Sequence, residues 1–266
     1  LKWVDLFYEN PAMITLNPVF FLKGNNYLLE SLFFIKSKDK FDEALQKLKS
    51  VIETNQLPKD ENVEALSFLY YNINTINGFF IDGSFKEGVA IIDQIDKDLE
   101  RYKDRIDEHH TMIFYYKFAS LHFGSGNNKQ CIFYLNKIIS NKSLTMREDL
   151  LCFSRVLNLV AHYEAGLDYH LDTLLRTTYK FLIQMNELHE VQKEMIKFIR
   201  KLQDIYPQDI KKAFKSLLEK LKTYENHPFE RRAFLYLDII SWLESKVNNV
   251  PVDQVIRQKY LQQNAI

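Results

Sequence analysis

The sequence predicts an all-α protein, an α-solenoid of about twelve helices stacked as antiparallel hairpins, and three observations support this fold class. The small residues Ala44, Gly88 and Cys131 lie 44 and 43 residues apart, and a period between about 20 and 50 residues is the signature of a stacked-repeat protein. The chain has 7 Gly and 6 Pro, too few for a β-protein with many tight turns. Its residues are 46% hydrophobic and 14% aromatic, which is enough for a continuous core.

The first hairpin is expected to begin at Asn17, which resembles a helix cap and is followed by proline at the first helical position. This helix should run to about Lys38, and a second helix over about 41–54 completes the pair. The apolar residues of the first helix recur at helical spacing, as expected for a buried face. They are Phe21, Leu28, Leu32 and Ile35.

The second hairpin is expected to consist of a long helix, capped by Asp60 and ending near Ile81, and a shorter partner. The pair Asp82-Gly83 supplies the break between the two helices. The segment Ser84 to Glu87 has the spacing of a capping box, which predicts that the next helix begins there.

The third hairpin is expected over about 107–123 and 128–139, separated by a turn rich in Gly and Asn. A second capping box, Thr145 to Glu148, should open the fourth hairpin. Its first helix should end near Glu164, and the second should cover about 168–185 after a stop at Gly166.

The remaining helices are less regular, and we expect them over about 187–205, 207–224, 228–246 and 251–261. We interpret the whole chain, 1–266, as one repeat domain. Its clearest repeats are expected at 18–55, 60–103, 107–140 and 145–186, followed by irregular C-terminal helices over 187–266.

The turns and second helices of the first repeats resemble the tetratricopeptide repeat, whose hairpins carry a Gly-x-Tyr-x-x-Ala turn. Asp39 to Leu45 and Gly83 to Val89 carry the resemblance. It implies that Phe41 and Phe85 pack under the turns and that the small residues named above allow close helix approach. Ala119 matches the small residue of a first helix.

The resemblance covers about 25–140 and departs from the family in period, which is 34 residues there and 43 to 44 here. About one extra turn in each helix accommodates the difference, so the chain looks like a divergent, long-helix version. HEAT or armadillo repeats are the competing interpretation, because they have a period near 40 to 47 residues.

The charge and cysteine content bound the classes of function. The 35 basic and 35 acidic residues cancel, which argues against a protein that coats nucleic acid. Two cysteines form no disulfide framework and favour a reducing, cytoplasmic location. No apolar run is long enough for a membrane span, so no membrane insertion is expected. The chain begins at Leu1 rather than Met, which leaves open a fragment or a processed form.

The sequence lacks the common enzyme motifs, and we therefore expect no catalysis, no cofactor and no metal. One polar cluster at the tip of the fourth hairpin could ligate zinc or iron in principle, which keeps a metal-dependent enzyme as a remote alternative. Polar residues also collect at helix ends as caps, and this interpretation is favoured. The cluster consists of His162, Glu164, Asp168, His170 and Asp172.

The tetratricopeptide resemblance implies that the first helices of the hairpins line a concave, partner-binding groove. The side chains predicted to contact a protein or peptide there are Asn26, Asn77, Tyr116, Lys117 and Ser120. Amides such as Asn77 can hold a peptide backbone, and Lys117 could bind a carboxylate. The predicted function is a non-catalytic binding scaffold, and the alternative is a regulatory or sensory module of a longer protein that responds to a peptide or small ligand.

Overall fold

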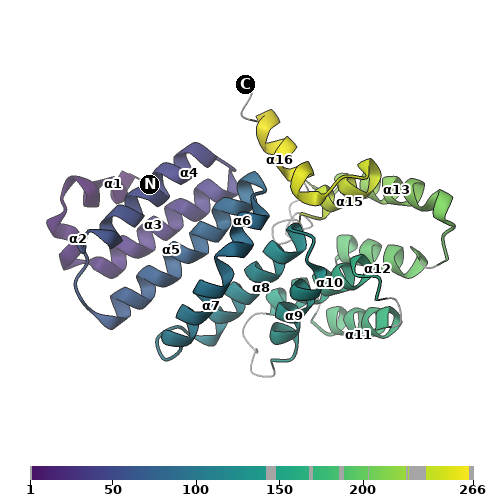
Figure 1. Ribbon diagram of the computed structural model, residues 1–266, viewed down its shortest axis with the longest axis horizontal. Coiled ribbons are helices and arrows are strands. Elements are labelled where there is room, and N and C mark those ends of the chain that lie inside the picture. The colour runs from purple at the N-terminus through teal and green to yellow at the C-terminus, as the bar shows by residue number, and fades with distance from the viewer. Residues whose placement is uncertain are drawn as a thin grey trace. The chain divides into compact units, whose positions relative to one another are not determined.

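The computed structural model of the protein is helical throughout the residues that it describes (Figure 1). Those residues are 2–141, 148–167, 170–185, 189–202, 204–225, 227 and 238–263. The chain divides into two compact units, residues 1–114 and residues 115–266, which we call the N-terminal unit and the C-terminal unit. The division falls within helix α8 (Glu108–Gly124). The predicted all-α fold class is confirmed for the described residues.

The N-terminal unit is built from helices of very different length, of which α3 and α5 are the longest before α8. In chain order its helices before α8 are α1 (Lys2–Glu9), α2 (Ala12–Leu16), α3 (Pro18–Phe34), α4 (Lys38–Glu53), α5 (Glu61–Asp82), α6 (Phe85–Ala90) and α7 (Ile92–Arg101). The short helices α1 and α2 were not predicted from the sequence.

Helices α3, α4 and α5 form the centre of the N-terminal unit, and each of them packs against the other two (Figure 1). Phe41 of α4 is fully buried there. A methyl group added at Gly78 of α5 would lie 3.4 Å from the Phe41 ring, so Phe41 packs directly over this glycine at ordinary van der Waals distance. The contact between α3 and α5, the first helices of successive hairpins, is the packing that a stack of helical repeats requires.

The helix ends of this unit confirm some of the expected caps and correct others. Asp60 caps α5 as predicted, because its carboxylate accepts hydrogen bonds from the backbone N–H groups of Asn62 and Val63. Gly83 has a φ of 76°, the left-handed conformation that ends a helix. The predicted capping box at Ser84 is wrong, because the Ser84 side chain accepts no hydrogen bond from its helix.

The C-terminal unit begins within α8 and continues with helices that are no longer than α8. Its further helices are α9 (Asn128–Ile139), α10 (Glu148–Glu164), α11 (Leu171–Gln184), α12 (Glu190–Leu202), the short 3₁₀ helix η2 (Pro207–Asp209), α13 (Ile210–Lys222), α15 (Ile239–Asn248) and α16 (Val252–Gln263). In none of the described segments is a helix both long and apolar enough to cross a membrane.

Packing in the C-terminal unit again joins helices that are close in sequence. Helix α10 contacts α9, α11 and α12, and the chain of contacts continues from α12 to α13, from α13 to α15 and from α15 to α16. The ring of Phe214 lies 4.9 Å from the Phe198 ring and 5.6 Å from the Trp242 ring, centroid to centroid. These edge-to-face contacts place aromatic side chains of α12, α13 and α15 in one core.

Several predicted boundaries are corrected by the structure. Helix α3 ends at Phe34 instead of Lys38, because Lys36 takes a φ of 54° that no right-handed helix allows. Ile35, predicted as a buried position, is consequently 72% exposed. By contrast, α9 has the predicted bounds. The expected capping box at Thr145 and most of the predicted helix after Pro228, up to 237, lie outside the described residues.

The small residues that define the repeat are buried, as predicted. Ala44 is 8% exposed, Cys131 is fully buried, and Gly88 belongs to the buried face of α6. The aromatic side chains assigned to the turns, Phe41 and Phe85, are also buried. The pattern read from the sequence therefore marks core positions.

Replacing Ala44 with leucine should overpack the contact of α4 with its neighbours and lower the free energy of unfolding by about 1 to 3 kcal/mol. Ala90→Leu is the matched control, because Ala90 is exposed on α6 and should tolerate the larger side chain. Chemical denaturation of both variants measures the difference. Equal stabilities would contradict the repeat register.

Candidate functional site

Two of the predicted binding residues, Asn26 and Asn77, lie inside the N-terminal unit. Asn26 is 8% exposed and Asn77 is 3% exposed. The side-chain N–H₂ of Asn74 donates to Asn26 Oδ1 at 2.8 Å, and that of Asn77 donates to Asn74 Oδ1 at 3.2 Å. Asn77 is thus a buried residue, and its amide donates to Asn74 within the same helix. A role of these residues in partner binding stays a prediction.

This amide network joins α3 to α5, with Asn26 on the first helix and Asn74 and Asn77 on the second. Asn26 also donates to Glu30 Oε1 at 3.2 Å, and Asn74 donates to the carbonyl oxygen of Tyr70 at 2.8 Å. A slip of one helix by one turn would leave these buried amides without partners, which is costly in a low-dielectric interior. The network therefore fixes the register of the two helices.

A second buried amide joins α1 to α3. The Tyr8 hydroxyl donates to Asn25 Oδ1 at 2.7 Å, and the Asn25 N–H₂ donates to the carbonyl oxygen of Phe21 at 3.0 Å. Burial raises the pKa of Tyr8 well above its ordinary value, and the hydrogen bond to Asn25 opposes the increase only in part. Tyr8 is therefore a neutral donor at neutral pH.

The Asn77→Ala variant should lower the free energy of unfolding by about 1 to 3 kcal/mol, because it leaves Asn74 Oδ1 without a donor in the core. Asn72→Ala is the matched control on the same helix, where the partly exposed amide donates only to the carbonyl oxygen of Phe68. Its change should stay within about 0.5 kcal/mol. If denaturation midpoints show equal losses, the network does not stabilise the α3–α5 contact.

The other three predicted binding residues belong to α8 in the C-terminal unit. Tyr116 is buried at 4% exposure, whereas Lys117 and Ser120 keep part of their surface. The Ser120 hydroxyl donates to the carbonyl oxygen of Tyr116 at 2.9 Å, within its own helix. A common groove formed by these residues with Asn26 and Asn77 stays a prediction.

Two residues of the predicted polar cluster, Glu164 and His162, lie at the end of α10 and make different contacts. Glu164 Oε1 accepts a hydrogen bond of 2.7 Å from Trp242 Nε1, and its other oxygen pairs with Lys246, so this carboxylate ties α10 to α15. His162 is 8% exposed, and its Nδ1 lies 2.8 Å from the Asn158 carbonyl oxygen. Asp168 lies outside the described residues. Within the described ranges no group of three His, Cys, Asp or Glu side chains could hold a metal ion.

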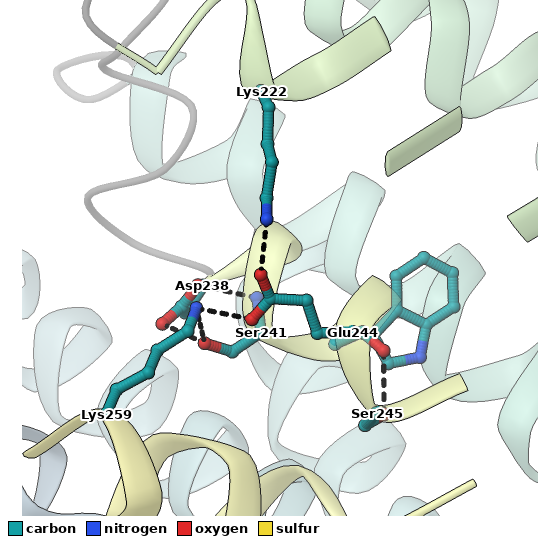
Figure 2. Close-up of polar contacts among 7 residues, drawn as sticks. Lys222, Asp238, Ser241, Glu244, Ser245 and Lys259 are labelled. Carbon is teal, nitrogen blue, oxygen red and sulfur yellow. Dashed lines mark hydrogen bonds and ion pairs between the residues drawn. The ribbon is translucent and has the colours of Figure 1, made fainter. Parts of the chain in front are cut away.

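The C-terminal helices are held together by a second carboxylate, Glu244 of α15 (Figure 2). Lys222 of α13 reaches it at 2.7 Å and Lys259 of α16 at 2.8 Å. Burial by itself raises the pKa of Glu244, but the hydrogen bonds from both lysines outweigh it, and the pKa is lowered below its ordinary value. Lys259 also donates to the Ser241 hydroxyl at 2.8 Å, and Ser241 donates to Asp238.

Several lysines of the basic stretch from Lys193 to Lys222 form ion pairs within the protein. They are therefore less available to bind a ligand than the composition of the stretch indicates. Lys193 pairs with Glu190 at 2.7 Å, and Glu194 receives both Lys197 at 3.2 Å and Lys220 at 2.8 Å. These pairs neutralise much of the local excess of positive charge.

His162 should make stability depend on pH. Burial lowers its pKa below the ordinary 6.5, so the unfolded chain takes up a proton before the folded protein does. The free energy of unfolding should therefore fall as the pH decreases from 6.5 and become level below the folded pKa. Denaturation across this range should give a flatter profile for His162→Gln than for the wild type. Parallel profiles would contradict this assignment.

Arg155 of α10 is a side chain that no sequence pattern selected. Its guanidinium carbon lies 4.3 Å from the centroid of the Phe181 ring on α11, and its Nε is buried without a hydrogen-bond partner among the described residues. Burial lowers the pKa of Arg155, and no carboxylate contributes to the shift. Because arginine stays charged in proteins, this is a partly buried cation for which the described residues supply no hydrogen-bond partner at Nε.

The same part of α10 carries further unpaired polar atoms. Ser154 is fully buried and Asn158 is 3% exposed, and within the described residues neither Ser154 Oγ nor Asn158 Oδ1 has a partner. Residues three and four apart share a helix face, so Asn158 lies on one face with Arg155 and with Ser154. The unpaired Gln192 Oε1 belongs to α12, which packs on α10. We call Ser154, Arg155 and Asn158 the polar face of α10, and it is the candidate site.

Comparison with known proteins adds no family to these observations. No family model matches the chain, and neither the curated proteins nor the solved structures gave a match. The resemblance to tetratricopeptide repeats therefore stays a prediction.

Proposed function

We propose that this protein is a non-catalytic helical-repeat scaffold that binds a segment of another protein or a peptide. The observation that carries the proposal is the polar face of α10, where a permanent positive charge and buried hydrogen-bonding atoms lack partners among the described residues. Buried polar groups are nearly always paired in folded proteins. Exceptions concentrate at functional sites, because a ligand supplies the missing partner.

The packing pattern supports a solenoid as the framework for such a site. In the N-terminal unit α3 contacts α5, and in the C-terminal unit α10 contacts α12, so a helix packs on its second neighbour in sequence as well as on its hairpin partner. Stacked repeats use this arrangement, and their extended surfaces bind other chains. We propose the tetratricopeptide-like solenoid on this basis.

The chemistry of Arg155 favours a carboxylate as the ligand group. A guanidinium presents its donors as a planar fork that matches the two oxygens of a carboxylate, and stacking on an aromatic ring leaves this fork free. Aspartate, glutamate and the C-terminus of a peptide all provide such a group. We therefore propose that the bound segment is acidic or ends at this site.

We propose that the polar face of α10 binds a ligand and does not catalyse a reaction. On α10, eight residues separate Ser154 from His162, which is about 12 Å along a helix axis. A general base must lie within hydrogen-bonding distance of its nucleophile. The arrangement of these two residues therefore favours binding over catalysis.

Selection of random displayed peptides against the purified protein tests the proposal. We expect enriched peptides to carry Asp, Glu or a free C-terminus, and to bind Arg155→Gln about 10- to 150-fold more weakly than the wild type, since a hydrogen bond to a charged group is worth roughly 1.5 to 3 kcal/mol. Arg176→Gln is the matched control, because Arg176 is exposed on α11.

The free energy of unfolding of each variant distinguishes a loss of peptide binding from a loss of folding. Arg155→Gln should unfold within about 1 kcal/mol of the wild type, because the lost contact with Phe181 is offset by the relief of a desolvated charge. Peptides that bind the variant and the wild type equally would contradict a site at Arg155. The absence of any enriched peptide would contradict the scaffold function.

A further inference from the structure

Helix α3 carries three exposed aromatic side chains in a row. Phe20 is 60% exposed, Tyr27 is 55% exposed and Phe34 is 59% exposed. They are seven residues apart, which is close to two helical turns, so they lie along one line of the helix surface. We call Phe20, Tyr27 and Phe34 the α3 stripe.

The surroundings of the α3 stripe are also apolar. The Phe20 ring lies 4.8 Å from the Trp3 ring, so α1 supports one end of the stripe. Leu16 is 76% exposed and Val19 is 39% exposed, next to Phe20 in the sequence. Helices α1 and α2, which pack on α3, add the exposed side chains Leu6 and Met13.

The exposed apolar area is large for a protein in water. An aromatic side chain has about 150 to 250 Å² to bury, so the stripe alone exposes roughly 300 to 400 Å². With its aliphatic neighbours the total is on the order of 600 Å², the upper end for the largest patch of a monomer. It approaches the roughly 800 Å² that each partner buries in a standard protein interface.

Two charges of opposite sign accompany the α3 stripe, one on each side of Tyr27. Lys23 precedes Tyr27 by four residues and is exposed, and Glu30 follows it by three residues and is partly exposed. In an antiparallel pair of such helices, Lys23 of each copy would therefore lie level with Glu30 of the other copy. A surface with this symmetry is complementary to itself.

We propose that the α3 stripe is the interface between two copies of this chain, packed antiparallel about a twofold axis at Tyr27. In this arrangement Phe20 lies at the height of Phe34 of the partner subunit, because both are seven residues from the axis. Lys23 faces Glu30 of the partner subunit. Because the formal net charge is zero, no net-charge repulsion opposes the association of two copies. The proposal goes beyond the scaffold function and does not depend on Arg155.

Sedimentation of the purified full chain tests the proposal directly. The wild type should be a dimer at protein concentrations up to about 100 μM. Tyr27→Glu places two carboxylates at the axis and should give a monomer. Tyr206→Glu is the matched control, because Tyr206 is 73% exposed in the C-terminal unit, and this variant should remain a dimer. Circular dichroism establishes that both variants are folded.

A charge exchange tests the antiparallel arrangement. Lys23→Glu should weaken the dimer by about tenfold, because each of two symmetric contacts then joins like charges. Adding Glu30→Lys should restore the dimer, and added salt should reduce both effects. Loss of dimers in Lys23→Glu without recovery in the double variant would overturn the antiparallel pairing.

Two other results would overturn the proposal. A wild type that is monomeric at every concentration shows that the α3 stripe does not bind a second copy. A dimer that persists in Tyr27→Glu shows that another surface joins the subunits. If the monomeric wild type, but not Tyr27→Glu, binds phosphatidylcholine vesicles, the stripe contacts a lipid surface instead.

Discussion

A helix in a stacked array can bury its apolar side chains only against its neighbours, and the other features of this protein depend on that constraint. Helix α3 packs against α4 and α5, and its side chains Phe21 and Leu29 are fully buried. Among the described residues it also contacts the short helices α1 and α2, and the Phe21 ring lies 5.6 Å from the Phe7 ring of α1. These neighbours leave Phe20, Tyr27 and Phe34 of α3 exposed, and a second copy of the chain would cover them.

Buried polar groups have different consequences in the two units. In the N-terminal unit the amides of Asn26, Asn74 and Asn77 are paired with one another, and the pairing determines how α3 and α5 align. On α10 the Ser154 and Asn158 oxygens and the Arg155 Nε find no partner among the described residues. A paired network stabilises the fold, whereas an unpaired one costs stability unless a ligand completes it. This contrast directs the functional proposal to α10.

Ion pairs explain why Arg155 is the cation to test among many charged residues. Glu164 and Glu244 each bind a lysine from another helix and so hold the C-terminal helices together. Lysines of the basic stretch, such as Lys220, are paired with glutamates. Arg155 differs from them because its charge is partly buried against Phe181, and no ion pair to a carboxylate is found for it within the described part of the chain.

The sequence by itself determined the helical fold class, the buried repeat positions such as Ala44 and Cys131, and the bounds of α9, because spacing and helix caps are local properties of the chain. It indicated Asn77 as a partner-binding residue of a groove, and that role stays a prediction. Only the tertiary structure showed that this amide is buried and paired, and that Arg155 Nε is buried without a hydrogen-bond partner among the described residues. Both depend on how the helices pack against one another, which no local pattern encodes.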